Sequence, residues 1–172
     1  MKYEKLMNSA REGKKFETLK DGKVLAEIKK RFLENPNKDM FISFVDCLTD
    51  SLVYVPMNAI LSDKNAEFIK DKKFGDEFQL PEQVRMVPDY LQDPEGKLYL
   101  PIFIQEEQVD KEYHDHFSGA WLHISEVIDL YRHPREKLEG ILIDAHTYPY
   151  ILSEELIQII ENIMDLKEKN IK

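Results

Sequence analysis

The sequence predicts an α+β (or α/β) fold, a single compact domain in which amphipathic helices cover a mixed sheet of about four to five strands. Two almost continuous apolar segments, residues 98–104 and 140–144, predict strands that are covered on both faces. Several other segments repeat apolar residues at the helical period. A chain of 172 residues has room for one substantial core.

Two helices are predicted near the N-terminus, after an arm over residues 1–21. The arm has many charges and weak periodicity, which is typical of a loosely ordered segment or a marginal helix. Asp21 and Asn37 are good N-cap residues, and apolar side chains then recur at the helical spacing over residues 22–34 and 38–48. These patterns predict two helices that each bury one face.

The next segments predict strands around a long irregular excursion. Residues 52–56 are short, β-branched and aromatic, which predicts a strand that its final proline closes or places at an edge. Residues 57–83 contain only short apolar patches and are expected to form a mobile loop or a small insert. Residues 84–91 are predicted to pair with residues 98–104 as an antiparallel hairpin across the turn at residues 93–96.

Helices and strands are then predicted to follow one another. Residues 105–117 favour a helix with an acidic start, and residues 120–124 favour a short strand. Ser125 is a good N-cap for a helix that ends near Arg132. The apolar strand at residues 140–144 follows and is expected to be central in the sheet.

The C-terminal part predicts a loop, a final helix and a frayed end. Residues 145–150 are expected to form the loop, and Ser153 then caps a helix with two glutamates in its first turn. This helix has the clearest amphipathic pattern in the chain. The predicted domain therefore spans residues 22–166, and residues 167–172 are expected to be a flexible tail.

Composition and charge favour a cytoplasmic protein that binds neither nucleic acid nor membrane. The net charge is −9, and an acidic surface repels phosphate backbones. Basic residues are concentrated in residues 1–40, which carry a net charge of +4. A solvated helix face or a flexible end explains this charge, and contact with an acidic surface is the alternative. No apolar segment reaches the roughly 18 residues of a membrane-spanning helix, and the N-terminus lacks the apolar core of a signal peptide. The lone Cys47 gives no disulfide framework and is expected to be buried and unreactive beside Asp46.

His114 and His116 are the nearest approach to a metal site. Two histidines at i and i+2 can share a metal ion on a strand, but on a helix they point about 200° apart. The segment is predicted to end a helix, so we expect no metal there. No glycine-rich phosphate loop is present, and no cofactor is expected.

The candidate site is the loop after the strand at residues 140–144. Asp144, His146, Tyr148 and Tyr150 lie there, and ligand crevices in α/β sheets open at the carboxyl ends of strands. An Asp–His pair can perform acid–base chemistry, but no serine or cysteine nucleophile in a strained elbow accompanies it, so no catalytic residue is assigned. The four residues are predicted to bind a ligand or a partner, with packing of the loop against the core as the structural alternative.

The order of these signals resembles a known family. A short strand ends in proline at residues 52–56, a glycine turn leads into Leu-Tyr-Leu-Pro-Ile-Phe-Ile at residues 98–104, and Gly-Ile-Leu-Ile-Asp at residues 140–144 precedes an acidic-capped final helix. Over residues 22–165 this order is similar to the N-terminal domain of the SseB family, the enhanced serine sensitivity proteins. The chain departs from the family pattern at Asp144-Ala145, which replaces Asn-Pro.

The resemblance implies a fold and a role, but no mechanism. A second departure is Gln105, which stands where the family usually has a small hydroxyl residue. The family has no agreed catalytic residue or cofactor to transfer, and its larger members carry a second, C-terminal domain. The expected function is a non-catalytic cytoplasmic accessory or protein-interaction module of the SseB type with an unknown protein partner. Its partner surface is expected to join the 144–150 loop to the neighbouring residues 57–83. The alternative is a small-molecule-binding domain or hydrolase that uses the 144–148 loop.

Overall fold

The computed structural model describes residues 22–73 and 75–170 and confirms the α+β class. The predicted N-terminal arm and its cap Asp21 lie outside the described residues. In the described part of the chain the helices are α3 (Lys23–Glu34), α4 (Lys38–Thr49), α5 (Asp63–Lys70), α6 (Lys111–His114), α7 (Ile124–Arg132) and α8 (Glu154–Asn170). The strands are β1 (Leu52–Ile60), β2 (Arg85–Pro88), β3 (Leu91–Gln92), β4 (Leu98–Ile102), β5 (Ser118–His123), β6 (Gly140–Ile143) and β7 (Tyr150–Leu152).

The strands form two sheets that meet at one point. Strands β3, β4, β6 and β7 make a mixed sheet in which β4 and β6 run parallel and each outer strand is antiparallel to its neighbour. Strands β2, β1 and β5 make an antiparallel sheet. Tyr54 of β1 and Phe103, just after β4, exchange two backbone hydrogen bonds of 2.8 Å. The four-stranded mixed sheet agrees with the predicted architecture. The second, antiparallel sheet was not predicted.

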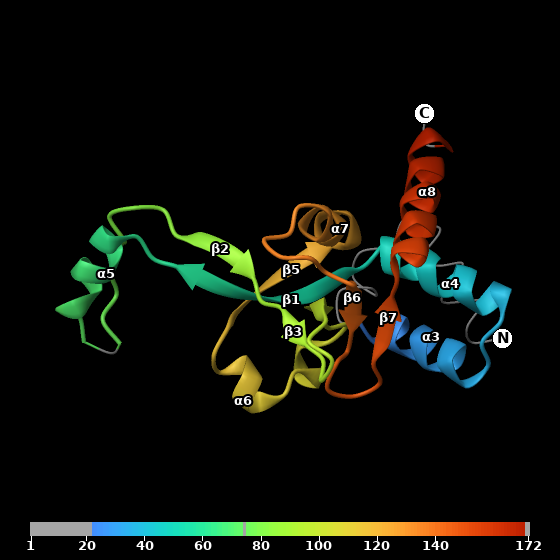
Figure 1. Cartoon of the computed structure of the whole chain (residues 1–172), viewed down its shortest axis with the longest axis horizontal. Coiled ribbons are helices and arrows are strands. Elements are labelled where there is room, and N and C mark those ends of the chain that lie inside the picture. The colour runs from blue at the N-terminus through green and yellow to red at the C-terminus, as the bar shows by residue number, and fades with distance from the viewer. Residues whose placement is uncertain (1–21, 74, 171–172) are drawn as a thin grey trace.

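Helices α3, α4, α7 and α8 lie on the side of the molecule opposite the end that holds α5 (Figure 1). Their apolar faces join the strands in one hydrophobic cluster. Predicted core positions such as Ile28, Phe44 and Ile141 are fully buried in it. Helix α4 begins as predicted, because Asn37 accepts the N–H of Met40 at 3.0 Å. The helical periodicity of the sequence therefore identified the faces that build the core.

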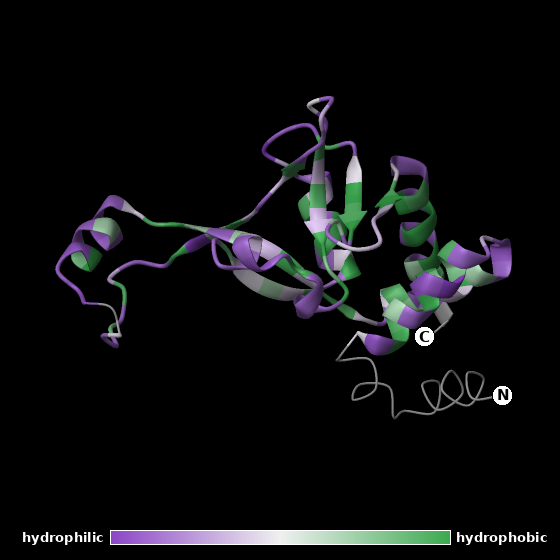
Figure 2. Ribbon diagram, turned by 90° about the horizontal axis from the view of Figure 1, so that it is seen from below, coloured by the Kyte–Doolittle hydropathy of each residue, from purple (hydrophilic) through white to green (hydrophobic). Residues whose placement is uncertain are grey.

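Residues 58–73 and 75–87 belong to an arm that projects from this body, with α5 at its far end (Figure 1). Figure 2 shows that hydrophilic residues dominate the tip of the arm. The prediction that Pro56 closes the strand is wrong, because β1 continues to Ile60. Pro56 pairs with β5 but precedes the residues that pair with β2, so its missing N–H is tolerated. Within the segment predicted to be irregular, residues 57–60 are therefore strand and residues 63–70 are helix.

The predicted hairpin and the predicted helix in the middle of the chain are both shorter in the structure than expected. Only β3 pairs with β4 across the predicted turn, because β2 pairs with β1 instead. Residues 105–117 contain a 3₁₀ turn at Glu106–Gln108 and the short α6 in place of one long helix. Asp110 interrupts the segment, because its carboxylate accepts two backbone N–H groups of α6 as an N-cap.

Two boundaries near the C-terminal part also differ from the prediction. Helix α7 begins at Ile124, before the predicted cap Ser125, because Glu126 accepts the N–H of His123 at 2.9 Å. Tyr150, predicted to lie in a loop, begins the edge strand β7, which pairs with β6. A strand of three residues is too short to show a period of two in the sequence.

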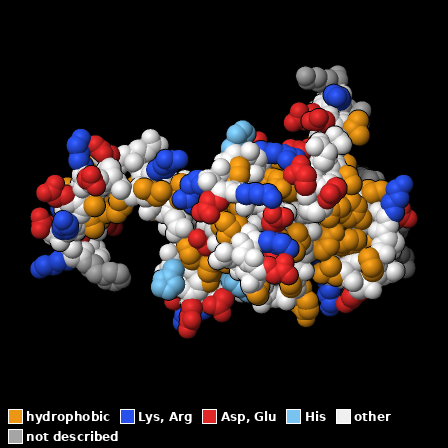
Figure 3. Space-filling model, in the orientation of Figure 1, with side chains coloured by type: hydrophobic (Ala, Val, Ile, Leu, Met, Phe, Trp, Pro, Cys, Tyr) orange, Lys and Arg blue, Asp and Glu red, His pale blue; other side chains and the backbone are white. Residues whose placement is uncertain are grey.

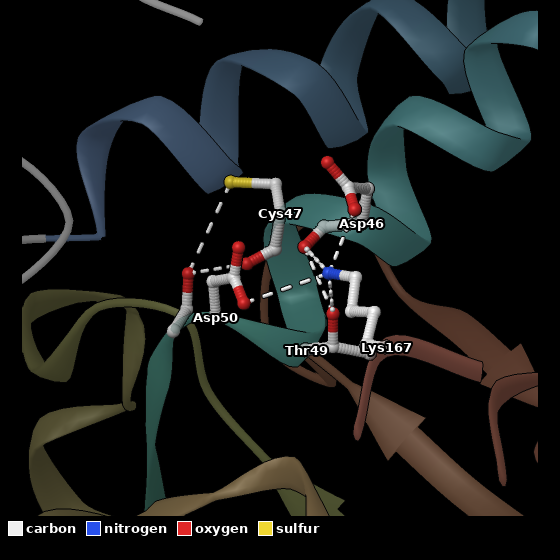
Figure 4. Close-up of polar contacts among 6 residues, drawn as sticks. Asp46, Cys47, Thr49, Asp50 and Lys167 are labelled. Carbon is white, nitrogen blue, oxygen red and sulfur yellow. Dashed lines mark hydrogen bonds and ion pairs between the residues drawn. The ribbon is translucent and has the colours of Figure 1, made fainter. Parts of the chain in front are cut away.

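Helix α8 begins directly after Ser153, the predicted cap, and residues 167–170 of the predicted tail are helical. Residues 171–172 lie outside the described part. Lys167 reaches the C-terminal end of α4, where its Nζ lies 2.7 Å from the carboxylate of Asp46 and 2.6 Å from the hydroxyl of Thr49 (Figure 4). A cation stabilises the carbonyl end of a helix, so this contact fastens α8 to α4.

Cys47 lies at the same helix end and is buried, as predicted (Figure 4). Burial raises the pKa of its thiol to about 11. The thiol is therefore protonated at neutral pH, and a protonated thiol is a poor nucleophile.

We expect Gly119→Ala to destabilise the protein. A Cβ atom at this position of β5 would lie 1.9 Å from the ring of Tyr54 on the neighbouring strand, so the buried ring must move. Overpacking of this kind typically costs about 1–3 kcal/mol in the free energy of unfolding. Urea unfolding measures the loss, with Ser118→Ala at an exposed position of the same strand as the control. Equal stability of the two variants would contradict the packing described.

Candidate functional site

The predicted site lies at the carboxyl ends of the two parallel strands. Ile104 follows β4 and Asp144 follows β6, so both segments leave the sheet at the same edge. Asp144 has a φ of 52°, in the left-handed region that aspartate adopts more readily than most residues. Gly22, which precedes α3, lies against Ile104, and a Cβ atom on this glycine would be 2.3 Å from the Ile104 carbonyl oxygen. The start of α3 is therefore held close to this edge.

A buried ion pair joins α3 to the loop between β6 and β7. The Nζ of Lys29 lies 2.5 Å from Oδ2 of Asp144 and donates at 2.5 Å to the backbone carbonyl of Tyr148. The other carboxylate oxygen, Oδ1, accepts the N–H of Ile104 at 2.9 Å. The Lys29 and Asp144 side chains are only 3% and 2% exposed. One ion pair thus connects a helix, the end of a strand and the candidate loop.

Burial and the carboxylate act on Lys29 in opposite directions. Loss of hydration lowers the pKa of the ammonium group, whereas the charge and the hydrogen bond of Asp144 raise it. Desolvation is the larger effect, so the pKa of Lys29 lies below its usual value. Removal of either partner leaves a buried group without its counter-charge, and such a change is strongly destabilising.

The ion pair lies at the base of a pocket of about 410 Å³. Ala26 and Leu33 of α3 and Tyr148 of the loop are among its lining residues. Tyr148 is 73% exposed, whereas Lys29 and Asp144 are buried, so the tyrosine lies at the open side. The pocket therefore combines a charged base with a partly apolar, accessible rim.

Gln108, which lines the same pocket, has an unpaired polar atom in its side chain. Within residues 22–73 and 75–170, its Oε1 is buried and accepts no hydrogen bond. The residue lines the pocket at the end of the 3₁₀ turn. A buried acceptor without a donor is energetically costly.

His146 and Asp144 point to different neighbours. The Nδ1 atom of His146 accepts the N–H of Asp110 at 2.9 Å, and its ring packs against Phe103 and Tyr113. Asp144 instead directs its carboxylate to Lys29. Asp144 lines the pocket, and His146 does not belong to its lining. The two side chains that the sequence places in one loop are therefore separated by the fold.

The two tyrosines of the predicted site also have different surroundings. Tyr148 is exposed beside the pocket, and its backbone carbonyl accepts a hydrogen bond from Lys29. Tyr150 packs its ring edge-on against Phe32 at 5.4 Å and against Phe44 at 6.0 Å between ring centroids. Burial raises the pKa of Tyr150, so its phenol stays neutral. Of the four predicted residues, Asp144 and Tyr148 share the pocket.

His114, weighed with His116 as a metal site, has other contacts. His114 lies 2.8 Å from Glu106 and stacks on Tyr54 with 6.0 Å between the ring centroids. In the described ranges, no three His, Cys, Asp or Glu side chains come together as a metal-ion site. Nor does any helix of the described chain have the length and apolar character needed to span a bilayer.

Lys29 and Gln108 belong to the pocket but do not appear among the predicted site residues. The sequence contains a signal for Lys29. This lysine follows Leu25 by four residues and precedes Phe32 by three, so it lies on the apolar stripe of α3. A lysine on a buried stripe needs a polar partner. No comparable signal marks Gln108, which lines the pocket at the end of the 3₁₀ turn.

The fold and the site define the class of protein: it is an α+β domain with two small sheets and a pocket at the carboxyl ends of a parallel strand pair. The chain matches the family described as the SseB protein N-terminal domain over residues 25–157. The match covers most of the chain, so the protein belongs to the SseB family, as the resemblance predicts. Comparisons with curated proteins and with solved structures gave no match. The matched region contains Lys29, Asp144 and Tyr148.

We expect Lys29→Met and Asp144→Asn each to lower the free energy of unfolding by about 3–5 kcal/mol, because each leaves a buried partner uncompensated. Asparagine also accepts the left-handed backbone of this position, so the second change leaves the turn in place. The double variant should lose less than the sum of the two single losses.

The control for this cycle is Lys30→Met on the same helix. Lys30 lies 4.0 Å from Glu34 with both side chains about two-thirds exposed, and such pairs are worth about 0–1 kcal/mol. Chemical unfolding of the four variants gives the comparison. Additive losses, or a Lys29→Met variant as stable as Lys30→Met, would show that the buried pair is not coupled.

Proposed function

We propose that this chain is a non-catalytic protein-interaction module of the SseB type, and that it receives a segment of a partner protein in the pocket beside the 144–148 loop. The observation that carries the proposal is the exposed Tyr148 next to a pocket with a buried polar base. Exposed aromatic residues that border a pocket commonly dominate binding energy in protein interfaces. The partner segment would bury the tyrosine ring together with Leu33 of α3.

The arm is not part of this surface. The sequence-based expectation joined residues 57–83 to the loop, but α5 lies at the far end of the arm, away from β6 and β7 (Figure 1). The surface we propose consists of one face of α3, the turn that holds Gln108, and the loop with Tyr148. Gln108 lines this surface, and its buried oxygen has no donor in the described chain.

The absence of catalysis is supported by the contacts of the candidate acid–base pair. A hydrolase that uses this loop needs Asp144 and His146 to act on the same group. Both carboxylate oxygens of Asp144 accept hydrogen bonds from Lys29 and Ile104, and Nδ1 of His146 accepts one from Asp110. Each group is thus engaged by the protein at a different place.

A small-molecule-binding domain is the second candidate, and the size of the pocket favours it. Ligand pockets commonly measure about 300–1,000 Å³, and this one measures about 410 Å³. Lys29, Asp144 and the free acceptor of Gln108 would orient a small polar ligand there. The same geometry can therefore serve either a side chain of a partner or a free metabolite.

The cytoplasm is the location we propose, with no nucleic acid or membrane as partner. The net charge of −9 disfavours phosphate backbones and anionic membrane surfaces alike. The single cysteine is buried as a thiol, which suits a reducing compartment.

The proposal is tested by affinity capture from cytoplasmic extract of the source cells, followed by titration of the purified partner. The pocket variant combines Tyr148→Ala with Leu33→Glu, and Ile159→Glu on the exposed face of α8 is the control. We expect the partner's dissociation constant to rise tenfold or more in the pocket variant, about the loss of one interface hot spot, and to be unchanged in the control.

Two outcomes count against the interaction module. A partner held equally well by the pocket variant places the interface elsewhere. If no partner is captured, and a metabolite raises the unfolding temperature of the wild type but not of the pocket variant, the small-molecule candidate replaces it.

A further inference from the structure

A second apolar cluster, separate from the main core, joins the part of the chain that contains α6 to the strands. Its buried side chains and those packed against it are Tyr54, Phe103, Val109, Tyr113 and Ala145. We call residues 105–117, which lie between β4 and β5, the α6 segment. A small cluster of this kind opens at a lower free energy than a main core, so single contacts at its border matter for the position of the segment.

His146 of the 144–148 loop makes one such contact, and the contact requires a neutral ring. The backbone nitrogen of Asp110 lies 2.9 Å from Nδ1 of His146. A backbone N–H can only donate, so Nδ1 must carry a lone pair and the ring proton must be on Nε2. A proton added at Nδ1 would make this acceptor a donor that faces another donor. The contact is therefore compatible only with an unprotonated imidazole.

The aromatic neighbours of His146 keep their charge state when the pH falls. Tyr113 packs edge-on against the imidazole, and its hydroxyl donates to Asp89 at 2.6 Å. Burial and the hydrogen bond to that carboxylate raise the pKa of Tyr113, so its phenol stays neutral. Phe103, which follows β4, packs against the same imidazole and has no charge.

The charged groups around the same ring have other partners or face water. Asp110 accepts two N–H groups of α6 with its carboxylate, and the carboxylate of Asp144 in the loop pairs with Lys29. On α6 itself, Lys111 and Glu112 are exposed, so solvent and salt screen their charges. The protonation of the imidazole itself is therefore the change that decides whether its contact with the α6 segment exists.

His114, within the α6 segment, responds to a proton in the opposite sense. Its Nε2 lies 2.8 Å from the carboxylate of Glu106 in the 3₁₀ turn, so a positive ring is attracted to this group. Figure 3 shows histidine side chains beside acidic ones at the lower edge of the body, where Figure 1 places α6. Acidification therefore favours a contact inside the α6 segment while it removes the contact between the segment and the loop.

We propose that His146 is a pH-sensitive link, which fastens the 144–148 loop to the α6 segment while its ring is neutral and releases the segment when the ring takes up a proton. Imidazole side chains ordinarily exchange this proton between about pH 5 and 8, so the link is closed above this range and open below it. The inference does not rest on what the pocket binds, because His146 does not belong to the pocket lining.

Nuclear magnetic resonance of the intact, nitrogen-15-labelled protein tests this inference over a titration from about pH 8 to 5. The ring C–H resonances of His146 report its protonation, and the backbone amide resonance of Asp110 reports the hydrogen bond. In the wild type the amide proton of Asp110 is expected to move upfield with the same midpoint as the ring, because it loses its acceptor.

Two matched variants separate this link from other titrations. His146→Asn offers an amide oxygen in place of Nδ1 but takes up no proton, so the Asp110 amide is expected to lose its pH dependence. His116→Asn makes the same substitution at another exposed histidine, just after α6, and is expected to keep the wild-type pH dependence. Thermal unfolding checks that both variants are folded.

Three results would overturn the inference. A wild-type Asp110 amide that stays in place while the His146 ring titrates shows that the contact does not depend on the proton, and a ring that stays neutral down to about pH 5 shows that the link never opens. A pH dependence that survives in His146→Asn, or disappears in His116→Asn, assigns the effect to another group.

Discussion

The contact between Lys29 and Asp144 is the constraint on which the site depends. An ammonium group on the buried face of α3 is unfavourable unless a counter-charge and hydrogen bonds compensate it. Asp144 supplies both, because the left-handed turn after β6 directs its carboxylate toward the helix. The same lysine holds the carbonyl of Tyr148, so the pair also fixes the path of the loop. The pocket and the exposed tyrosine at its rim follow from that path.

The division of the strands into two sheets explains the shape of the molecule. Strand β1 pairs with β5 within the body and with β2 beyond it, so a single long strand serves both the core and the arm. Backbone hydrogen bonds between Tyr54 and Phe103 connect β1 to the mixed sheet. The proposed partner site and the arm therefore lie on different parts of one continuous scaffold (Figure 1).

Local pattern predicts much of this fold, because most elements bury one face against a common core. The stripes of α3, α4 and α8 and the apolar strands β4 and β6 are visible in the sequence. What is missed depends on contacts distant in the chain. Lys29 meets a partner 115 residues away, and β7 is too short to show a period. The loop was identified, but Asp144 and His146 separate because each finds a different neighbour.

Native-state hydrogen exchange tests the central role of the ion pair most directly. The amide of Ile104 donates to the carboxylate of Asp144, and the amide of Thr147 donates to its carbonyl, so both report on the turn. In Lys29→Met these two amides should exchange faster, while the amides of Tyr54 and Phe103, which join the sheets, keep their protection. Unchanged exchange at Ile104 and Thr147 would show that the loop holds its position without Lys29, and would contradict the account.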